Sequence, residues 1–266
     1  TLGAMTFIDA FLLAIAVVVA AKTVAWLIQL RTGNGGVVDP IWAWSLGLLA
    51  VLFGVAGTAP VPVQLMVVLM GGIWGMRLGT HLWGRMAGKG EDFRYAKFRA
   101  QWGPRANFNL FFFYQFKNLF TLVLAASAFG VVAFRPDLPP WWALVLAPLI
   151  WGLAVVGEGV ADAQMDRFRR NLDNRGLVCR EGLWRYSRHP NYFFECVHWL
   201  AYAPLAWGAP YGWAVLVAPV VMALLLTKIS GMPMLEADMA ERKPGYAEYM
   251  RTTSPLIPWF PKKTSP

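Results

Sequence analysis

Long apolar runs alternate with short, mostly basic segments along this chain. Runs that approach the roughly 20 residues a helix needs to cross a bilayer occur at about 6–28, 40–58, 61–82, 116–134, 140–159, 192–208 and 210–229. The last two are short and are interrupted by prolines, so the pattern does not define their ends. We therefore predict an all-α, polytopic membrane protein with about seven transmembrane helices.

Lys and Arg are concentrated in three of the segments outside these runs. They lie between the third and fourth runs, between the fifth and sixth, and in the C-terminal tail, whereas the links at 58–60 and 208–210 contain none. Positive charge is enriched on the cytoplasmic side of membrane proteins. We therefore expect a bacterial inner (cytoplasmic) membrane protein with its N-terminus outside, its C-terminus in the cytoplasm, and basic cytoplasmic loops that could bind a cofactor.

Composition excludes several classes of protein. Hydrophobic residues make up 57% and charged residues 15% of the chain, which is far more apolar than a soluble globular protein. The net charge of +9 is spread between apolar runs and accompanies no recognition motif, so we expect no nucleic-acid partner. No Walker loop and no Gly-rich dinucleotide fingerprint is present. Cys179 and Cys196 fall in a predicted loop and a predicted helix, so we expect neither a disulfide nor a metal site.

The segment Gly182–Glu195 gives the strongest indication of a site. It is basic and polar, and it leads into an apolar helix with Pro190 in its first turn, where proline is well suited. The positive end of such a helix attracts anions such as a pyrophosphate. Asn191, Glu195 and Trp199 recur at every fourth residue and share one face. A carboxylate inside a membrane helix is costly, which favours a functional site. The alternative is that the arginines and tryptophans only mark the membrane interface.

Polar residues at helical spacing also leave the third and fifth apolar runs. His81 and Arg85 share a face at the end of the third run, and Asp162 is followed by Arg169 and Arg170 after the fifth. The carboxylate could bind ribose hydroxyls or an adenine amino group, and the two guanidiniums could neutralise a phosphate. The alternative is a solvated helix face with intrahelical ion pairs.

The two ends of the chain carry weaker candidates. Residues 236–251 are predicted to form an amphipathic helix at the interface. Tyr246 and Tyr249 could stack there on a flat ring, with Arg251 close behind, although interfacial tyrosines are common. Asp39 precedes a proline at the start of the second run, which favours helix capping over catalysis.

The order of these motifs resembles a bacterial branch of the steroid 5α-reductase family. The resemblance runs from about residue 37 to the C-terminus and is carried by 91–95, Arg99, 102–103, 161–162, 182–195, 233–236, 246–249 and Pro255. It implies a single membrane domain, 1–266, in which residues 1–135 form the helices of a substrate cavity and residues 136–266 bind NADPH at the cytoplasmic mouth.

The expected cofactor contacts follow from matching positions and from the motifs themselves. By resemblance they include Arg85, Asp162, Arg169, Tyr186, Asn191, Glu195 and Arg251. The basic segment, the shared helix face and the tail add Arg170, Arg188, His189, Tyr192, Trp199 and Tyr249.

The reaction implied by the resemblance is hydride transfer from the nicotinamide to a C=C bond of a lipophilic enone or steroid-like substrate that enters from the bilayer. Such a step needs a group that polarises the conjugated carbonyl. The family's Glu–Tyr pair has no counterpart here, because Asp39 and Trp74 stand at the corresponding places, and Phe194 stands where the branch usually carries Gly. A 3-oxo-4-ene steroid is therefore less well supported as the substrate. The candidate catalytic residues are then Asp39, His81 and Tyr114.

A second resemblance leaves an alternative open. Isoprenylcysteine carboxyl methyltransferases share an Arg-His-Pro-x-Tyr segment and a C-terminal helix with Glu and Tyr, but their cofactor, S-adenosylmethionine, has no phosphate. The arginine-rich surroundings and the 91–95 motif favour the reductase. A transporter or scaffold lacks support, because neither an inverted repeat nor a pair of broken helices is evident.

Overall fold

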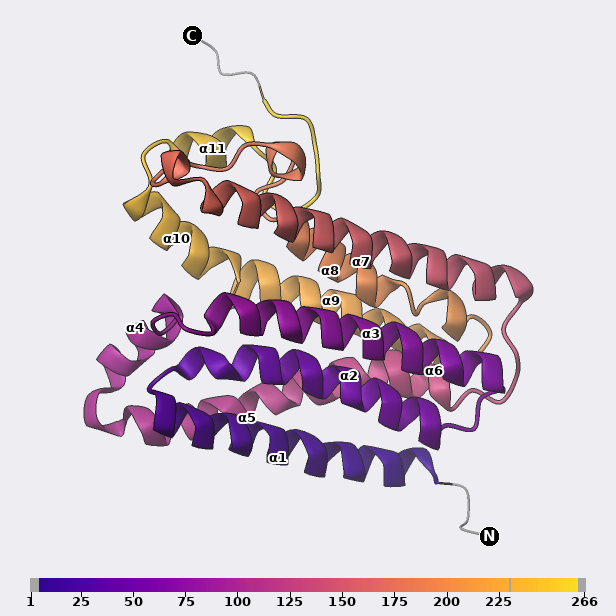
Figure 1. Ribbon diagram of the computed structural model, residues 1–266. Coiled ribbons are helices and arrows are strands. Elements are labelled where there is room, and N and C mark those ends of the chain that lie inside the picture. Colours follow the sequence, from indigo (N-terminus) through magenta and orange to yellow (C-terminus); the bar gives the residue numbers. More distant parts are fainter. Residues whose placement is uncertain (1–4, 230, 263–266) are drawn as a thin grey trace. The chain divides into compact units, whose positions relative to one another are not determined.

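The structure is a computed structural model that describes residues 5–229 and 231–262 (Figure 1). Within these ranges the chain is helical and contains no strand. Six helical runs in the described part are long and apolar enough to cross a membrane: Phe7–Thr32, Gly35–Ala56, Val61–Met86, Phe93–Ala133, Trp141–Arg170 and Gly212–Arg242. The predicted all-α, multi-pass membrane architecture is thus confirmed.

Backbone contacts divide the chain into two units. Unit 1 comprises Thr1–Val145 and Tyr202–Ala218, and unit 2 comprises Leu146–Ala201 and Pro219–Pro266. The roles predicted for residues 1–135 and 136–266 stay predictions, and the units themselves interleave along the chain because residues 202–218 belong to unit 1.

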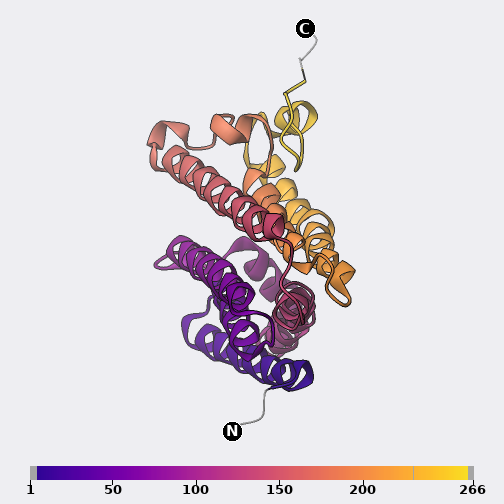
Figure 2. The same ribbon diagram turned by 90° about the vertical axis from the view of Figure 1, so that its right-hand side faces the viewer.

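Unit 1 is built from long helices that lie side by side, as Figures 1 and 2 show for α1, α2 and α3. A π-helical stretch, Ala125–Gly130, continues α5 into α6. The helices are α1 (Phe7–Thr32), α2 (Val38–Ala56), α3 (Val61–Met86), α4 (Phe93–Trp102), α5 (Ala106–Leu124) and α6 (Val131–Ala133).

Glycines allow α2 and α3 to approach closely. A Cβ atom added to Gly75 of α3 would lie 2.6 Å from the Cα atom of Gly47 on α2. One added to Gly71 would lie 2.3 Å from the Cβ atom of Ala50. The glycines of α3 therefore serve close helix packing.

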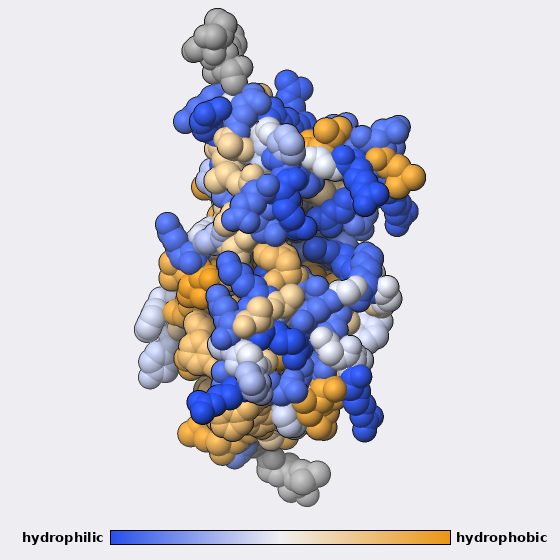
Figure 3. All heavy atoms as spheres, turned by 90° about the vertical axis from the view of Figure 1, so that its left-hand side faces the viewer, coloured by the Kyte–Doolittle hydropathy of each residue, from blue (hydrophilic) through white to orange (hydrophobic). Residues whose placement is uncertain are grey.

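The outer faces of the unit 1 helices suit lipid. On α3, Leu65, Leu69 and Met76 are more than half exposed, which is expected of side chains that face hydrocarbon rather than water. Hydrophilic side chains gather instead at the end where α4 lies (Figure 3). The membrane and the orientation of the termini stay predictions.

Unit 2 places a short helix and a returning tail beside a long helix. Its tail meets the segment that precedes α8: the backbone N–H of Arg188 donates to Ser254 at 2.8 Å, and that of Trp259 donates to Tyr186 at 2.9 Å. The helices of unit 2, two of which cross its boundary, are α7 (Trp141–Arg170), α8 (Pro190–Leu200), α9 (Val217–Leu224), α10 (Met232–Arg242) and α11 (Tyr246–Thr252).

Two predicted helices are shorter than the apolar pattern indicated. The run 192–208 does not form one spanning helix, because α8 has 11 residues and is followed by turns and a 3₁₀ helix, Pro204–Ala206. Pro204 lacks the N–H that would donate to the carbonyl of Leu200, which disfavours continuation of the helix. The predicted tail helix 236–251 is likewise two helices, separated at Gly245, whose φ of 80° is left-handed. Six candidate spans therefore stand where seven were predicted.

Candidate functional site

Four polar residues gather on facing surfaces of α7 and α8 in unit 2. Glu158 and Asp162 lie one turn apart on α7, and Asn191 and Glu195 lie one turn apart on α8. Nδ2 of Asn191 donates to Oδ1 of Asp162 at 3.4 Å. The three acidic residues are only 3%, 8% and 6% exposed, respectively. Buried carboxylates in apolar helices are costly, so this cluster is our candidate site.

The face of α8 offers a fixed carboxylate and an available acceptor. Nε1 of Trp199 donates to Oε1 of Glu195 at 2.9 Å, and the Trp199 ring is fully buried. The indole therefore holds the carboxylate in place, while its own predicted contact with a cofactor stays a prediction. Oδ1 of Asn191 is buried and accepts no hydrogen bond from the described residues. Because an unused buried acceptor is costly, this atom suits an N–H group of a ligand.

Phe194 is accommodated by a glycine on the facing helix. A Cβ atom added to Gly157 of α7 would lie 2.3 Å from the Phe194 ring. The ring therefore occupies the space that a side chain at position 157 would fill. Phe194, which stands where the branch that this chain resembles usually carries glycine, thus has a local structural explanation.

The segment that precedes α8 is held on two sides. The N–H of Leu183 donates to the side chain of Gln164 at 2.9 Å, and Nε1 of Trp184 donates to the carbonyl of Ala161 at 2.9 Å. On the other side the Tyr249 hydroxyl donates to the carbonyl of Trp184. These bonds fix the segment against α7 and α11.

Tyr249 occupies a structural position rather than an open one. The residue is 2% exposed, its ring centroid lies 5.7 Å from that of Tyr246, and the guanidinium of Arg180 lies 5.6 Å from it. Burial raises the pKa of both tyrosine hydroxyls above its ordinary value. Stacking of Tyr249 on a cofactor, as predicted, would require it to leave these contacts.

Arg188 and His189 form a clamp with Glu236 of α10. Nε and Nη2 of Arg188 donate to the two carboxylate oxygens at 2.8 and 3.2 Å. Nη1 donates to the backbone carbonyls of Met250 and Thr253. Nε2 of His189 lies 2.9 Å from Oε1 of Glu236. Every nitrogen of the guanidinium is thus engaged, so a phosphate contact would require Arg188 to give up part of this clamp.

The remaining predicted contacts are spread over both units. Tyr192 stacks on the His189 ring, with centroids 5.1 Å apart, and the Tyr186 ring meets Phe260 edge-on at 5.9 Å. The arginines of the prediction are exposed at the ends of helices: Arg85 on α3, Arg169 and Arg170 on α7, and Arg251 on α11.

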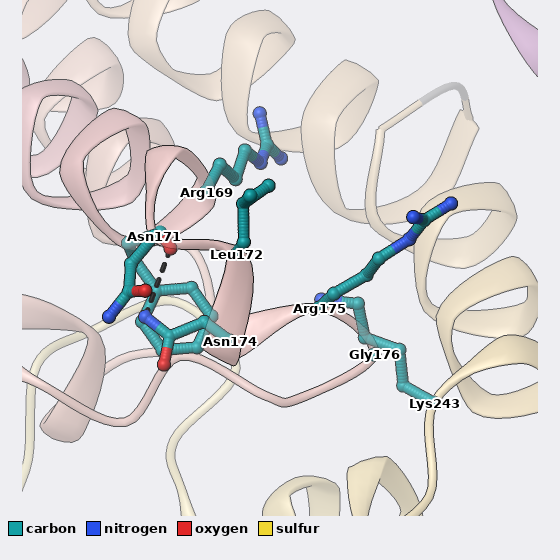
Figure 4. Close-up of a pocket in the computed structure, with 8 residues that line it drawn as sticks. Arg169, Asn171, Leu172, Asn174, Arg175, Gly176 and Lys243 are labelled. Atoms are coloured by element: carbon teal, nitrogen blue, oxygen red, sulfur yellow. Dashed lines mark hydrogen bonds between the residues drawn. The ribbon is translucent and has the colours of Figure 1, made fainter.

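Beyond the end of α7, basic residues line a cavity of about 330 Å³. Figure 4 shows Arg169 and Arg175 extending to the same side of the loop that follows the helix. Lys243 lies at the same cavity, whereas Arg170 is not among its lining residues. Sequence patterns had indicated Arg169 but neither of the other two cations.

In unit 1, Asp39 is the centre of an ion-pair network. Its carboxylate accepts from Arg94, from the Tyr95 hydroxyl and from Lys117, each at 2.8 Å. The predicted capping role is wrong, because the N-cap of α2 is Val37 and Asp39 lies within the first turn. The two cations neutralise the Asp39 carboxylate, which thereby connects α2 to α4 and α5.

The other two predicted catalytic residues differ in setting. The Tyr114 hydroxyl is buried and donates to the backbone carbonyl of Gly35, so a substrate contact would have to replace that bond. His81 is half-buried near the end of α3. The described hydrogen bonds do not join Asp39, His81 and Tyr114 into one catalytic group, although Asp39 and Tyr114 both contact Tyr95.

The motif 91–95 also has a structural role. Arg99 donates to both carboxylate oxygens of Glu91, at 3.1 and 2.9 Å, and Glu91 accepts from the backbone N–H of Gly35 at 2.7 Å. This arrangement ties α4 to the loop before α2. A glutamate and an arginine eight residues apart could not be paired from sequence alone, because the chain turns into α4 between them.

The sequence patterns did not indicate the contacts of two buried charged residues. Lys22 in the middle of α1 is fully buried, and its Nζ atom lies 3.4 Å from the Ser45 hydroxyl. A lysine within an apolar run was a usable signal that we did not weigh. Glu236 belongs to the motif 233–236, but its pairing with Arg188 gave no signal in the sequence, because the two residues are 48 positions apart.

Comparisons with known proteins identify a family but no characterised relative. The family described as "Protein of unknown function (DUF1295)" matches residues 25–253. No significant match was found among curated proteins or among solved structures.

Proposed function

On the premise that the chain belongs to the DUF1295 family, we propose that it is a membrane-embedded, NADPH-dependent reductase of a C=C bond in a lipophilic enone or steroid-like molecule. The observation that carries the proposal is the group of buried carboxylates on α7 and α8, which includes the Asn191–Asp162 pair. The resemblance to steroid 5α-reductases supports the same choice.

The polar groups of unit 2 fit the chemistry of a nicotinamide cofactor. Oδ1 of Asn191 and the carboxylate of Glu195 are acceptors, which suit the two N–H bonds of a carboxamide. Asp162 would accept from ribose hydroxyls, and Arg169 would neutralise a phosphate. This donor and acceptor set therefore fits the group that the proposal requires.

The reaction would move one hydride and one proton. When bound, NADPH supplies a hydride, which adds to the β-carbon of the enone and leaves NADP⁺. The α-carbon then takes a proton from a side chain or water, so the C=C bond becomes CH–CH and the carbonyl remains. The protein must fix the nicotinamide ring and stabilise the negative charge that develops on the carbonyl oxygen. Asp39, His81 and Tyr114 stay the candidates for polarising the carbonyl, and Asp39 and Tyr114 would have to give up structural bonds to do so.

Ligand titration of the detergent-purified protein tests this proposal. NADPH, NADH and S-adenosylmethionine are added separately, and tryptophan fluorescence and thermal shift are recorded. We expect binding of the nicotinamide cofactor and none of S-adenosylmethionine. Binding of S-adenosylmethionine alone would refute the reductase and make a membrane methyltransferase the working hypothesis.

Two variants locate the binding site. Asn191→Ala removes an amide, and Asp162→Asn removes the negative charge and turns one acceptor oxygen into an N–H₂ donor. Each variant should weaken NADPH binding by about tenfold or more. Asn109→Ala, a half-buried asparagine on α5 for which we propose no role, is the matched control. Unchanged NADPH affinity in both site variants would show that the placement is wrong.

A further inference from the structure

The basic cavity of unit 2 has an unusual lining. It is bounded by Phe168 and by Arg169, Asn171, Leu172, Asn174, Arg175, Gly176 and Lys243, and none of these described lining residues carries a carboxylate. Its volume of about 330 Å³ lies at the lower end of the range for ligand pockets. Three cations around a space of this size would suit a small anion.

The loop that carries these cations has a defined conformation. Asn174 donates from Nδ2 to the carbonyl of Phe168 at 3.0 Å, as the dashed line in Figure 4 marks. Asn171 caps the short 3₁₀ turn Leu172–Asn174 by accepting from the N–H of Asp173. Gly176 then has a φ of 82°, which favours glycine. The loop therefore returns on itself and sets Arg175 beside the end of α7.

Lys243 joins the cavity from a separate segment. It follows α10, and its Nζ atom donates to the carbonyl of Leu177 at 2.7 Å, which anchors the ammonium at the loop. Burial, and next the positive charge of Arg169, lower the pKa of Lys243. Both cations line the same cavity, and an anion between them would relieve their repulsion.

We propose that this cavity binds a phosphomonoester group. A phosphomonoester carries about −1.5 to −2 charges at pH 7 and three strong acceptor oxygens, which match two guanidiniums and one ammonium. Two sources offer this chemistry. One is the 2′-phosphate of NADPH, an assignment that rests on the proposed function and would make the protein prefer NADPH to NADH. The other is the headgroup of an anionic lipid such as phosphatidic acid, which does not rest on it.

Arg175→Gln and Lys243→Gln test the site, with Arg167→Gln as the matched control. Arg167 is an exposed arginine in the last turn of α7 that does not line the cavity. The probes are adenosine 2′,5′-bisphosphate and adenosine, followed by NADPH and NADH, all on the intact protein. We expect each site variant to weaken binding of the 2′-phosphorylated ligands by about 10- to 100-fold, with NADH and adenosine changed less than about twofold and the control unchanged.

A lipid experiment separates the two sources. The wild type and Arg175→Gln are placed in nanodiscs of phosphatidylcholine alone and of phosphatidylcholine with phosphatidic acid. If phosphatidic acid stabilises the wild type more than the variant, and the preference for NADPH does not depend on Arg175, the phosphate site stands with a lipid as its ligand.

The outcomes for this site and for the reductase are distinguishable. If NADPH and NADH bind equally and phosphatidic acid has no selective effect, the phosphate site is refuted while the reductase stands. If neither nucleotide binds, the reductase fails, and the lipid experiment alone decides the site. Equal weakening of NADPH and NADH by Arg175→Gln, without a lipid effect, would also overturn the assignment.

Discussion

The clamp between Arg188 and Glu236 should dominate the local stability of unit 2. Glu236→Ala removes a carboxylate that accepts from Arg188 at 2.8 and 3.2 Å and lies 2.9 Å from His189. The side chains of Arg188 and Glu236 are only 9% and 11% exposed, so solvent screens the pair little. Removal of one partner from a buried pair costs about 3–5 kcal/mol, because the remaining charge is buried without compensation.

A milder variant keeps the test informative if the alanine variant does not fold. Glu236→Gln retains one acceptor oxygen for Arg188 but turns an N–H₂ group toward a guanidinium donor. We expect it to lower the free energy of unfolding by about 1–3 kcal/mol. Asp238→Ala is the matched control on the same helix, because Asp238 pairs with Arg242, whose side chain is 58% exposed. Such an exposed pair contributes about 0.3–0.5 kcal/mol.

Equilibrium unfolding in mixed micelles, followed by tryptophan fluorescence, measures these differences. Of the 14 tryptophans, Trp184 and Trp199 lie on either side of Arg188 and His189 in the sequence, so they contribute the part of the signal that comes from near the clamp. A double-mutant cycle of Arg188→Ala and Glu236→Ala should also give a coupling energy above about 1 kcal/mol. The reasoning fails if Glu236→Ala is no more destabilising than Asp238→Ala. It also fails if the losses of stability caused by Arg188→Ala and Glu236→Ala are additive in the double variant.

Two further predictions concern packing and pH. Gly75→Ala should destabilise the protein by about 1–3 kcal/mol, because the new Cβ atom would lie 2.6 Å from Gly47. Gly72→Ala is the control and should not destabilise it, because the nearest atom to its new Cβ lies at 3.6 Å. Thermal unfolding of the two variants measures the difference. Burial raises the pKa of the Tyr249 hydroxyl in the folded protein. The contribution of this hydroxyl to folding stability is therefore complete below the unfolded pKa of about 10 and is lost as pH rises further. Tyr249→Phe should therefore cost about 1 kcal/mol at pH 8 and lose less stability than the wild type between pH 8 and pH 11; an equal alkaline loss would exclude this role for Tyr249.

The membrane architecture could be predicted because it depends on local composition. Apolar length is a property of single segments, and it indicated the long helices of unit 1 correctly. The partner of Gly75 on α2 is known only from the structure. The break after Leu200 was harder to predict, because apolar residues continue to 208 and a proline such as Pro204 disfavours a helix without excluding it, as Pro148 inside α7 shows.

The roles of individual charged residues could not be predicted, because they depend on distant partners. Asp39 looked like a cap, yet Lys117, 78 residues away, binds its carboxylate. Arg188 looked like a phosphate ligand, but its guanidinium is held by Glu236 and by the tail. A basic residue near a helix start has the same local sequence in either case, so only the tertiary structure distinguishes a ligand from a clamp.

The contact between Phe194 and Gly157 has an evolutionary consequence. A side chain at 157 and the Phe194 ring in its present position do not fit together, because the ring occupies the volume into which a Cβ atom at 157 would project. Homologous sequences should therefore show compensating changes at these two sites: a small residue at 194 would permit a larger one at 157, and a lineage that acquired the phenylalanine first would have passed through a destabilised intermediate unless glycine was already present.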